Sequence, residues 1–263
     1  MSTPFTILKF GSSVLRSGAD FGTAVREVSR HAGNGGHVVA VASAAGDTTD
    51  ALLEEAHGIA RSPEPRALAS LLATGERQSA ALLALALAAA GLDPVLLDPA
   101  EIGLEADGPP LDAVPVGLDQ SRLARRLEGR RVAVLPGFFG IGPGGEVALF
   151  GRGGSDLTAL FAAHALGARC RLLKDVGGVF EHDPAAEASR PRRYQALSWD
   201  AALGLGARVV QRKALLFARD AGVSFEVGAP GAADGTLVGP GPTRFASLDA
   251  SLDRPRELEA CPA

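Results

Sequence analysis

The stretch LFGRGGSDLTAL, residues 149–160, gives the sharpest signal for fold and function in this chain. A strand-like apolar run ends at Phe150, small and charged residues follow, and an apolar helical pattern starts after Ser155 and Asp156. One interpretation is a tight turn in which Ser or Asp caps a helix, as in many proteins. The other is a pocket in which backbone N–H groups and a helix N-terminus face an anionic ligand. The rest of the chain decides between them.

Strand-like and helix-like patterns alternate on both sides of this stretch. Short apolar runs typical of buried strands lie at residues 5–10, 37–43, 94–98, 131–138, 145–150, 170–180 and 223–229, the last strand expected. Helical patterns lie between them, at residues 20–32, 48–60, 67–91, 118–129, 156–168 and 198–222. This alternation predicts an α/β fold with a mainly parallel sheet that is covered by helices on both faces.

Local signals refine the expected elements. Thr48 or Thr49 is expected to cap the helix at 48–60. The long helical pattern at 67–91 is expected to break near Thr74 and Gly75. Gly91 should stop that helix. Residues 181–194 are expected to form a surface loop, and residues 240–263 a C-terminal tail.

Composition excludes several function classes. Of 263 residues, 46% are hydrophobic and 21% charged, which is enough apolar content for a globular core and argues against global disorder. The net charge of −4 lacks the excess of basic residues that is typical of nucleic-acid-binding proteins, although lysines and arginines can still gather locally around an anion. Two cysteines do not make a disulfide framework, and Cys170 is expected to be a packing residue.

No targeting or membrane segment is expected. The start, MSTPFTILKFG, has no basic region and no long apolar run, so it does not resemble a signal peptide. The most apolar segment, residues 79–92, is shorter than the roughly 18 residues of a membrane span. It predicts a helix that is buried on all sides, in the core or at a subunit interface. We therefore expect a cytoplasmic protein.

Lys9 lies near the end of the first predicted strand, directly before Gly11, Ser12 and Ser13. Ligands of α/β sheets bind beyond the carboxyl ends of the strands. A lysine beside small residues with open N–H groups suits a phosphate, although the P-loop pattern is absent. From this stretch alone, a surface lysine beside a turn is the alternative.

Two further segments suit a small polar substrate. Hydroxyl groups and a glycine follow a predicted strand at residues 43–50, where they either cap the next helix or hold a ligand. Glu76 lies within a long apolar pattern, and a carboxylate is costly to bury without a partner. A substrate ammonium group is one suitable partner, and Arg77 or solvent is the alternative.

Two glycine-containing segments have different interpretations. Residues 174–184, KDVGGVFEHDP, follow a strand directly and either wrap a nucleotide or form a turn. Residues 135–150 predict a glycine-rich hairpin and not a dinucleotide-binding turn, because a strand follows the glycines. His37, His57 and His164 lack metal-ligand spacing, and no Ser-His-Asp or Cys-His set can be assembled.

The order of these segments resembles the catalytic domain of aspartate kinases, within the amino acid kinase family. The similarity runs from about residue 6 to residue 238, with its most specific part at 151–158. GDTTD at 46–50 and TGE at 74–76 support it in the same order. The resemblance implies a three-layer αβα sandwich, with a kinase domain over residues 1–239. It also implies ATP over the C-terminal half, the amino acid over the N-terminal half, and Mg²⁺-dependent phosphorylation of the side-chain carboxylate of L-aspartate.

The same resemblance implies roles for individual residues. Lys9 matches the lysine that stabilises the transferring phosphoryl group, Asp156 the aspartate that organises the site, and Arg208 a lysine that reaches the ATP phosphates. Glu76 would receive the amino group of the substrate, and Arg152 would grip a carboxylate. Substrate contacts are implied for Ser43, Thr48, Glu76, Arg152, Gly153 and Ser155. ATP contacts are implied for Lys9, Gly11, Ser12, Lys174, Asp175, Phe180, Asp183 and Arg208. No protein ligand for the metal is expected.

Departures from the family pattern keep two alternatives open. One glycine of the usual Lys-Phe-Gly-Gly is missing after Gly11, and KFGSSVL is partly similar to glutamate 5-kinases. Lys174 stands in place of the usual threonine, and Arg208 in place of the usual lysine. We therefore expect a kinase of aspartate. The alternatives are a kinase of another amino acid such as glutamate, and a catalytically weak nucleotide-binding subunit that partners another enzyme of the aspartate pathway.

The resemblance also bears on regulation and assembly. Aspartate kinases commonly carry C-terminal ACT domains, and the 25 residues after Val238 are too few for one. We expect lysine, threonine and methionine to leave the activity of this chain unchanged. We also expect a homodimer that forms through the catalytic domain, with the apolar helix around residues 80–90 as its contact.

Overall fold

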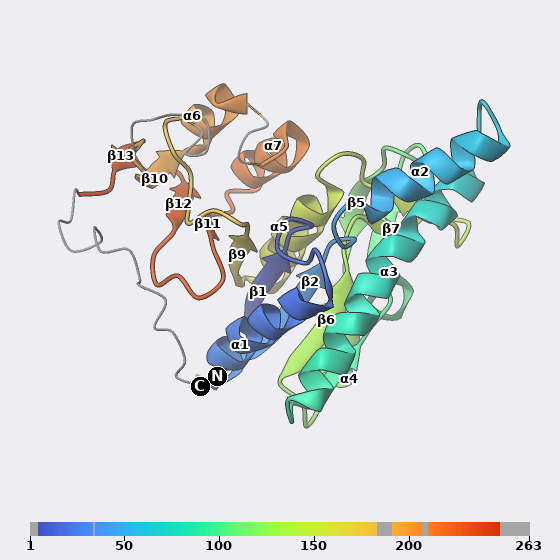
Figure 1. The fold of residues 1–263 in the computed structure, drawn as a ribbon, viewed down its shortest axis with the longest axis horizontal. Helices are drawn as coiled ribbons and strands as arrows, with labels where there is room; N and C mark the ends of the chain where they lie inside the picture. The colour runs from blue at the N-terminus through green and yellow to red at the C-terminus, as the bar shows by residue number, and fades with distance from the viewer. Residues whose placement is uncertain (1–4, 34, 183–190, 207–209, 248–263) are drawn as a thin grey trace, which may run out of the picture.

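A long mixed sheet forms the middle layer of the molecule (Figure 1). The structure is a computed structural model and describes residues 5–33, 35–182, 191–206 and 210–247. Within these residues the sheet has nine strands in the order β13-β10-β12-β11-β9-β1-β2-β6-β3. Their bounds are β1 Phe5–Phe10, β2 His37–Ala42, β3 Pro94–Leu96, β6 Val132–Pro136, β9 Arg169–Leu173, β10 Tyr194–Ser198, β11 Phe225–Gly228, β12 Thr236–Gly239 and β13 Arg244–Phe245.

Most neighbouring strands of this sheet are parallel, as the alternating sequence pattern predicts. β1 pairs in parallel with β2 and β9, and β6 pairs in parallel with β2 and β3. Antiparallel pairing joins β11 to β12 and β10 to β13. The carboxyl ends of β1, β2, β6 and β9 therefore meet at one edge of the sheet, which is where α/β sheets bind their ligands.

Helices cover both faces of the sheet. They are α1 Phe21–Ala32, α2 Thr48–Ile59, α3 Pro65–Ala89, α4 Gln120–Arg126, α5 Gly154–Leu166, α6 Trp199–Gly204 and α7 Arg212–Asp220, with short 3₁₀ helices η1 Gly18–Asp20 and η2 Pro99–Ile102. Successive residues of a strand point to opposite faces. Leu8 of β1 belongs to a buried cluster with Val28 of α1 and Leu83 of α3, whereas Ile7 belongs to a second cluster with Leu160 of α5. The predicted three-layer αβα sandwich is confirmed.

A second, smaller sheet packs against α2 and the first half of α3. In the described residues it has four strands in the order β5-β4-β7-β8, with bounds β4 Glu105–Asp107, β5 Val114–Gly117, β7 Phe139–Ile141 and β8 Val147–Leu149. β7 and β8 form the predicted glycine-rich hairpin. Phe139 and Leu149 are buried together with Leu72 of α3 and Ala56 of α2. This small core is separate from the two clusters on the faces of the large sheet.

Helix α3 corrects two expectations. It runs unbroken from Pro65 to Ala89, so the predicted break near Thr74 and Gly75 is wrong. A Cβ on Gly75 would lie 3.1 Å from Cγ2 of Thr48 and 3.3 Å from Cβ of Ala44, so this glycine permits close packing of α3 on the start of α2. Segment 79–92 is not buried on all sides within the chain, because Leu82 and Leu85 are 43% and 67% exposed, and its burial at a subunit interface stays a prediction. Gly91, with φ of +82°, follows the helix as expected.

Other boundaries also differ from expectation. The N-cap of α2 is Asp47, and Thr48 is its first helical residue. β11 is not the last strand, since β12 and β13 follow it, and β13 lies within the stretch that was expected to be a tail. Residues 183–190 of the expected loop and residues 248–263 lie outside the described residues. Among the residues that the structure describes, no helix has both the length and the apolar character that a membrane crossing requires.

Candidate active site

Two lysines share one buried carboxylate at the carboxyl edge of the large sheet. Lys9 lies near the end of β1, Lys174 follows β9, and β1 and β9 are neighbours. Lys9 Nζ lies 2.7 Å from Oδ1 of Asp156, and Lys174 Nζ lies 2.9 Å from Oδ2. Asp156 is in the first turn of α5. The fold thus brings together residues from three separate elements of the chain.

Charge governs the protonation of this triad. Burial alone would raise the pKa of Asp156, but Lys9 and Lys174 outweigh burial and lower that pKa to about 2. Burial lowers the pKa of the Lys9 ammonium from its ordinary value, and Asp156 opposes this effect. With all three groups ionised, two ammonium groups and one carboxylate leave a net positive charge. Such a site attracts an anion, and the low local dielectric strengthens the attraction.

Glu76 is a second buried carboxyl group beside this triad. Its side chain belongs to α3, and the residue is only 4% exposed. Ser155 Oγ lies 3.3 Å from both of its carboxylate oxygens. Burial raises the pKa of Glu76 to about 7, and the backbone of Ala44 and Gly137, together with Lys9 and Ser155, opposes the rise. A buried carboxyl group that gives up its proton near neutral pH can receive a ligand cation.

Glycines let the backbone close in around Glu76 and Lys9. A Cβ on Gly137, which follows β6, would lie 2.7 Å from Cβ of Ser155. A Cβ on Gly11 would lie 3.3 Å from the carbonyl oxygen of Leu173, and the Gly11 N–H donates to that oxygen. Ser43 is buried directly beyond β2, and its N–H donates to the carbonyl of Phe10. The residues at the carboxyl ends of β1, β2, β6 and β9 are thus closely packed against one another.

The GRGGSD segment forms a tight turn that places Arg152 at the surface. Gly151 and Gly153 both have left-handed φ values, +72° and +77°, which only glycine adopts without strain. The Gly154 N–H donates to the carbonyl oxygen of Gly151 at 2.9 Å. Arg152 is exposed and makes no ion pair with the other described residues. Its guanidinium group is therefore available to a ligand.

Phe138 is a strained residue beside this turn. Its φ is +74°, a value that is costly for a side chain of this size. Its N–H donates to Oγ1 of Thr158, and its carbonyl accepts from the N–H of Phe150. A Cβ on Gly154 would lie 2.8 Å from its ring. These contacts hold the strained residue against the N-terminus of α5.

Several residues expected in the site lie less centrally. The Thr48 hydroxyl donates to the carbonyl of Ala45 at 2.6 Å and acts as a turn cap. Asp175 is exposed and pairs with Arg16 at 3.1 Å. Ser12 is exposed. Phe180 is partly exposed, and its backbone pairs with that of Arg193 in an isolated β-bridge. Arg208 and Asp183 lie outside the described residues, so their expected roles stay predictions.

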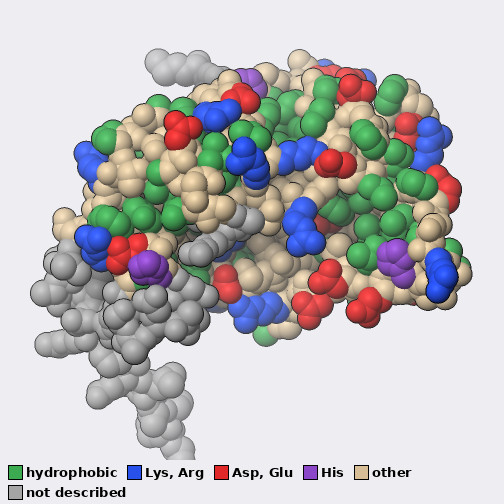
Figure 2. Space-filling model, turned by 90° about the horizontal axis from the view of Figure 1, so that it is seen from above, with side chains coloured by type: hydrophobic (Ala, Val, Ile, Leu, Met, Phe, Trp, Pro, Cys, Tyr) green, Lys and Arg blue, Asp and Glu red, His purple; other side chains and the backbone are tan. Residues whose placement is uncertain are grey.

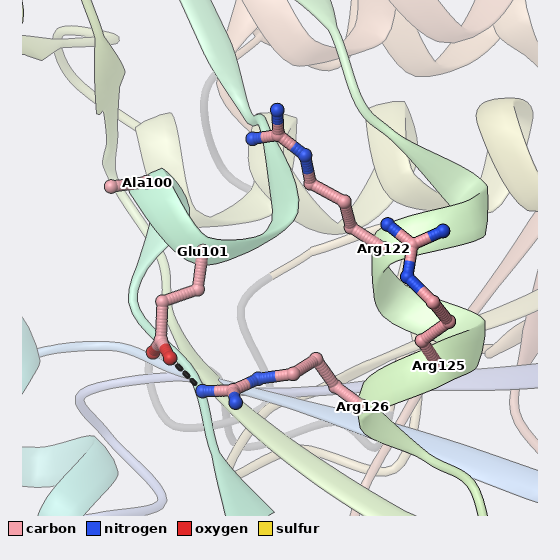
Figure 3. A pocket seen from close by; sticks show the side chains of 5 residues that line it. All are labelled: Ala100, Glu101, Arg122, Arg125 and Arg126. Atoms are coloured by element: carbon pink, nitrogen blue, oxygen red, sulfur yellow. Dashed lines mark hydrogen bonds and ion pairs between the residues drawn. The ribbon is translucent and has the colours of Figure 1, made fainter.

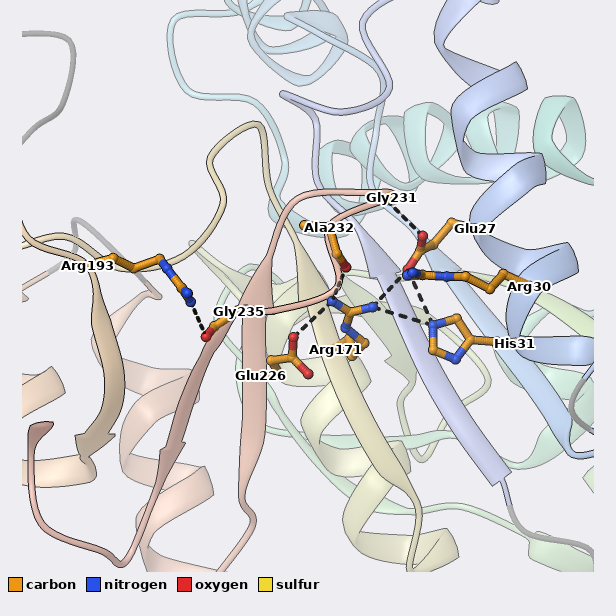
Figure 4. A network of polar contacts seen from close by, with 9 residues as sticks. All are labelled: Glu27, Arg30, His31, Arg171, Arg193, Glu226, Gly231, Ala232 and Gly235. Carbon is orange, nitrogen blue, oxygen red and sulfur yellow. Dashed lines mark hydrogen bonds and ion pairs between the residues drawn. The ribbon is translucent and has the colours of Figure 1, made fainter. Parts of the chain in front are cut away.

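A buried ionic network supports the segment beside Lys174 (Figure 4). Glu27 of α1 accepts from Arg171 Nη1 at 3.0 Å and from the N–H of Gly231 at 2.9 Å. Arg171 Nη2 also binds Glu226 at 2.9 Å. Burial opposes ionisation of Glu27, but the hydrogen bonds, led by that of His31, lower its pKa to about 2. The network fixes the β11–β12 loop to α1 next to the Lys174 N–H, which donates to the carbonyl of Gly228.

A separate hollow lies between η2 and α4 (Figure 3). It has a volume of about 340 Å³ and is lined by Ala100, Glu101, Arg122, Arg125 and Arg126. Carboxylates balance two of its arginines, since Arg126 pairs with Glu101 and Arg122 with Asp119. None of the residues expected in the site lines this hollow, so it is distinct from the Lys9–Asp156–Lys174 centre.

The surface seen from above Figure 1 carries interspersed basic and acidic side chains (Figure 2). Its middle holds lysine and arginine side chains next to acidic ones, with hydrophobic side chains scattered around them. Among the described residues on this face there is no broad basic stripe of the kind that binds a nucleic acid backbone.

Sequence comparison places this chain in a known family. A sequence profile of the amino acid kinase family matches residues 4–228. The chain belongs to the amino acid kinase family. Its curated relatives include the aspartokinase of Bacillus sp. (strain MGA3), 34% identical over 225 residues that cover 84% of this chain and 54% of the relative. An aspartokinase of Thermus thermophilus is 35% identical over 206 residues that cover 77% of this chain and 51% of the relative. The chain thus spans about half the length of these relatives.

Solved structures give the same picture of the fold. The aspartate kinase from Synechocystis superposes with a TM-score of 0.78 at 28% identity, covering 90% of this chain and 40% of that one. A UMP kinase from Bacillus anthracis has a TM-score of 0.68 at 17% identity, covering 92% of this chain and 98% of that one. The second similarity concerns the fold alone.

Sequence reasoning missed one feature of the centre and one contact at its rim. It assigned Lys174 to the nucleotide, but did not place it on the same carboxylate as Lys9. The sequence held part of the signal, since each lysine lies at the end of a predicted strand, but the pairing of those two strands comes from the structure. It also missed the contact between Lys213 and Asp112, for which the sequence holds no local signal.

Proposed function

We propose that this domain transfers the γ-phosphoryl group of ATP to the side-chain carboxylate of L-aspartate, giving 4-phospho-L-aspartate and ADP. The observation that carries the proposal is the pair of lysines on Asp156, next to the buried carboxyl of Glu76. Identity of 34% to 36% with several aspartokinases supports the choice of aspartate.

Phosphoryl transfer requires positioning and neutralisation of negative charge more than covalent catalysis. An oxygen of the aspartate carboxylate bonds to the γ-phosphorus while the bond from that phosphorus to the bridging oxygen of ADP breaks. The acceptor is already an anion at neutral pH, so no general base is needed. Lys9 and Lys174 donate hydrogen bonds to the phosphoryl oxygens as charge develops on them. Asp156 directs both lysines to that point.

The acceptor is held by its two other charged groups. Its ammonium group binds the carboxylate of Glu76, and this positive charge favours release of the proton that a pKa of about 7 leaves partly bound at neutral pH. Arg152 binds a carboxylate with its planar guanidinium fork. Ser43, Thr48, Gly153 and Ser155 complete the pocket, with Thr48 acting by shaping the turn before α2.

The nucleotide lies over the segment that follows β9. Gly11, Ser12, Lys174, Asp175 and Phe180 line its binding site in this proposal, together with Asp183 and Arg208. Mg²⁺ accompanies the phosphates of the nucleotide, as is usual for kinase substrates. The residues that the structure describes contain no group of three or more His, Cys, Asp or Glu side chains placed to hold a metal ion.

A coupled ADP-release assay with ATP, Mg²⁺ and a panel of amino acids tests the proposal. Turnover with aspartate supports it. Turnover with glutamate alone favours the alternative acceptor, and no turnover with any amino acid favours a nucleotide-binding subunit that partners an enzyme of the aspartate pathway. The proposal includes a homodimer through α3 in the cytoplasm, supported by the exposure of Leu82 and Leu85.

A further inference from the structure

Lys213 connects two distant parts of the chain at the rim of the site. It lies in the first turn of α7, and its Nζ lies 2.5 Å from Oδ1 of Asp112 and 2.8 Å from the carbonyl oxygen of Ala113. Asp112 and Ala113 precede β5 of the small sheet. The contact therefore joins a helix beside the large sheet to the small sheet, across 100 or more positions of sequence.

The segment that Lys213 grips is itself fixed to the strand before the Arg152 turn. The Ala113 N–H donates to the carbonyl oxygen of Leu149, and the Leu149 N–H donates to that of Pro110, both at 2.8 Å. Asp112 then lies directly against Gly151, where a Cβ would be 2.5 Å from the carboxylate oxygen that Lys213 binds. Lys213 thus contacts Asp112, and Asp112 in turn contacts Gly151.

The other end of the turn meets the residue that caps α7. A Cβ on Gly153 would overlap the side chain of Gln211, the N-cap of that helix. Gly151 is therefore confined by Asp112 and Gly153 by Gln211, with Arg152 between them. Gln211 and Lys213 both belong to the start of α7, and Lys213 holds the carboxylate of Asp112 against Gly151.

We propose that Lys213 is a positioning residue for the acceptor: through Asp112 it fixes the Gly151–Arg152–Gly153 turn and so directs Arg152 to the substrate carboxylate. This inference rests on the proposed function, which assigns that carboxylate to Arg152. Lys213 is 30% exposed, and its partner Asp112 is 72% exposed, so neither belongs to the buried core. Their loss frees the turn without removing a core contact.

Kinetic separation of the two substrates tests the proposal. Lys213→Met and Asp112→Asn should each lower kcat/KM for aspartate by roughly 10- to 100-fold, the usual cost of a misplaced substrate contact. The KM for ATP should stay within about twofold, because the Lys9–Asp156–Lys174 centre is untouched. Lys213→Arg, which keeps the charge, should restore most of the activity. The double variant should be no worse than the poorer single variant, because both changes break one contact.

Arg130→Met is the matched control. Arg130 also forms a partly exposed ion pair, with Asp93 at 3.0 Å, but neither residue touches the turn. This variant should keep the kinetics of the wild type. Losses that are equal for aspartate and ATP in Lys213→Met would overturn the proposal, as would a kcat/KM for aspartate within about twofold of the wild type.

A measurement that needs no turnover separates this inference from the proposed function. Hydrogen exchange of a peptide covering residues 149–156 reports the bond from the Gly154 N–H to Gly151. Exchange there should be faster in Lys213→Met than in the wild type or Arg130→Met. If the wild-type protein does not phosphorylate aspartate, the proposed function is contradicted. Faster exchange in Lys213→Met would then still support the role of Lys213 in fixing the turn. Unchanged exchange would overturn that role.

Discussion

The ammonium group of Lys9 lies 2.7 Å from Oδ1 of Asp156, and both residues are at most 5% exposed. Burying an ion pair costs desolvation that its mutual attraction often only balances. Lys174 at the other oxygen adds a second cation to one carboxylate. The excess positive charge is therefore better explained by an anionic ligand than by stability.

Lys9→Ala tests this interpretation. Removal of a preorganised cation should lower kcat/KM with aspartate by at least roughly 100-fold. The fold should persist, because Lys174 still compensates Asp156. Activity is measured by ADP release and folding by thermal melting. Near-normal activity in a folded variant would remove Lys9 from the site.

Arg152→Ala should cut kcat/KM for aspartate by at least roughly 100-fold, because a bidentate partner of the substrate carboxylate is lost. Arg152 is exposed, so the melting temperature should not change. Arg152→Lys keeps the charge but not the fork, and it should recover only part of the loss. A full rescue by lysine would contradict recognition by a planar fork.

Glu76 should make stability depend on pH. Its folded pKa of about 7 lies above its ordinary value of 4.5, so the folded protein holds this proton more tightly than the unfolded chain. The resulting stability is present below pH 4.5, declines between pH 4.5 and 7, and is lost above pH 7. Glu76→Gln should therefore raise the free energy of unfolding at pH 8 by up to about 3 kcal/mol, with little change at pH 5. Urea titrations at the two pH values measure this, and a Glu76→Gln protein less stable than wild type at pH 8 would contradict it.

Binding of the acceptor should release a proton from the same group. An ammonium ion beside Glu76 favours the carboxylate, so aspartate binding near pH 7 should liberate a fraction of a proton. Calorimetry in buffers with different ionisation enthalpies measures the release. Glu76→Gln should abolish any release. A release that persists in this variant would assign the proton to another residue.

Leu85→Glu tests the proposed dimer. Leu85 is 67% exposed on α3, so the change should leave the monomer folded. A charged residue in an apolar interface should shift the light-scattering mass at micromolar concentration from dimer to monomer. Val116→Glu, at a 55% exposed position on β5, is the control and should leave the mass unchanged. A wild-type protein that is already monomeric would exclude this contact.

The sequence predicted the layers of the fold because strand and helix periodicities are local. Local patterns drew attention to Lys9 and Glu76 but left two interpretations for each, and only the resemblance to aspartate kinases implied roles for them and for Asp156. Sequence reasoning failed at Gly75, whose role depends on Thr48 and Ala44 packing against it and not on the helix itself. The Lys213–Asp112 contact was equally out of reach, since it depends on how α7 meets the small sheet.

The two lysines of the proposed transfer and the proposed acceptor pocket are held by different parts of the fold. Lys9 lies in β1 and Lys174 directly follows β9, and the parallel pairing of these two strands fixes the backbone positions of both lysines. The first half of α3 and the hairpin before Arg152 rest on their own small core. Under the proposed function, acceptor choice can therefore diverge, in evolution or by engineering, through substitutions confined to that small core and its loops, while Lys9 and Lys174 keep their positions.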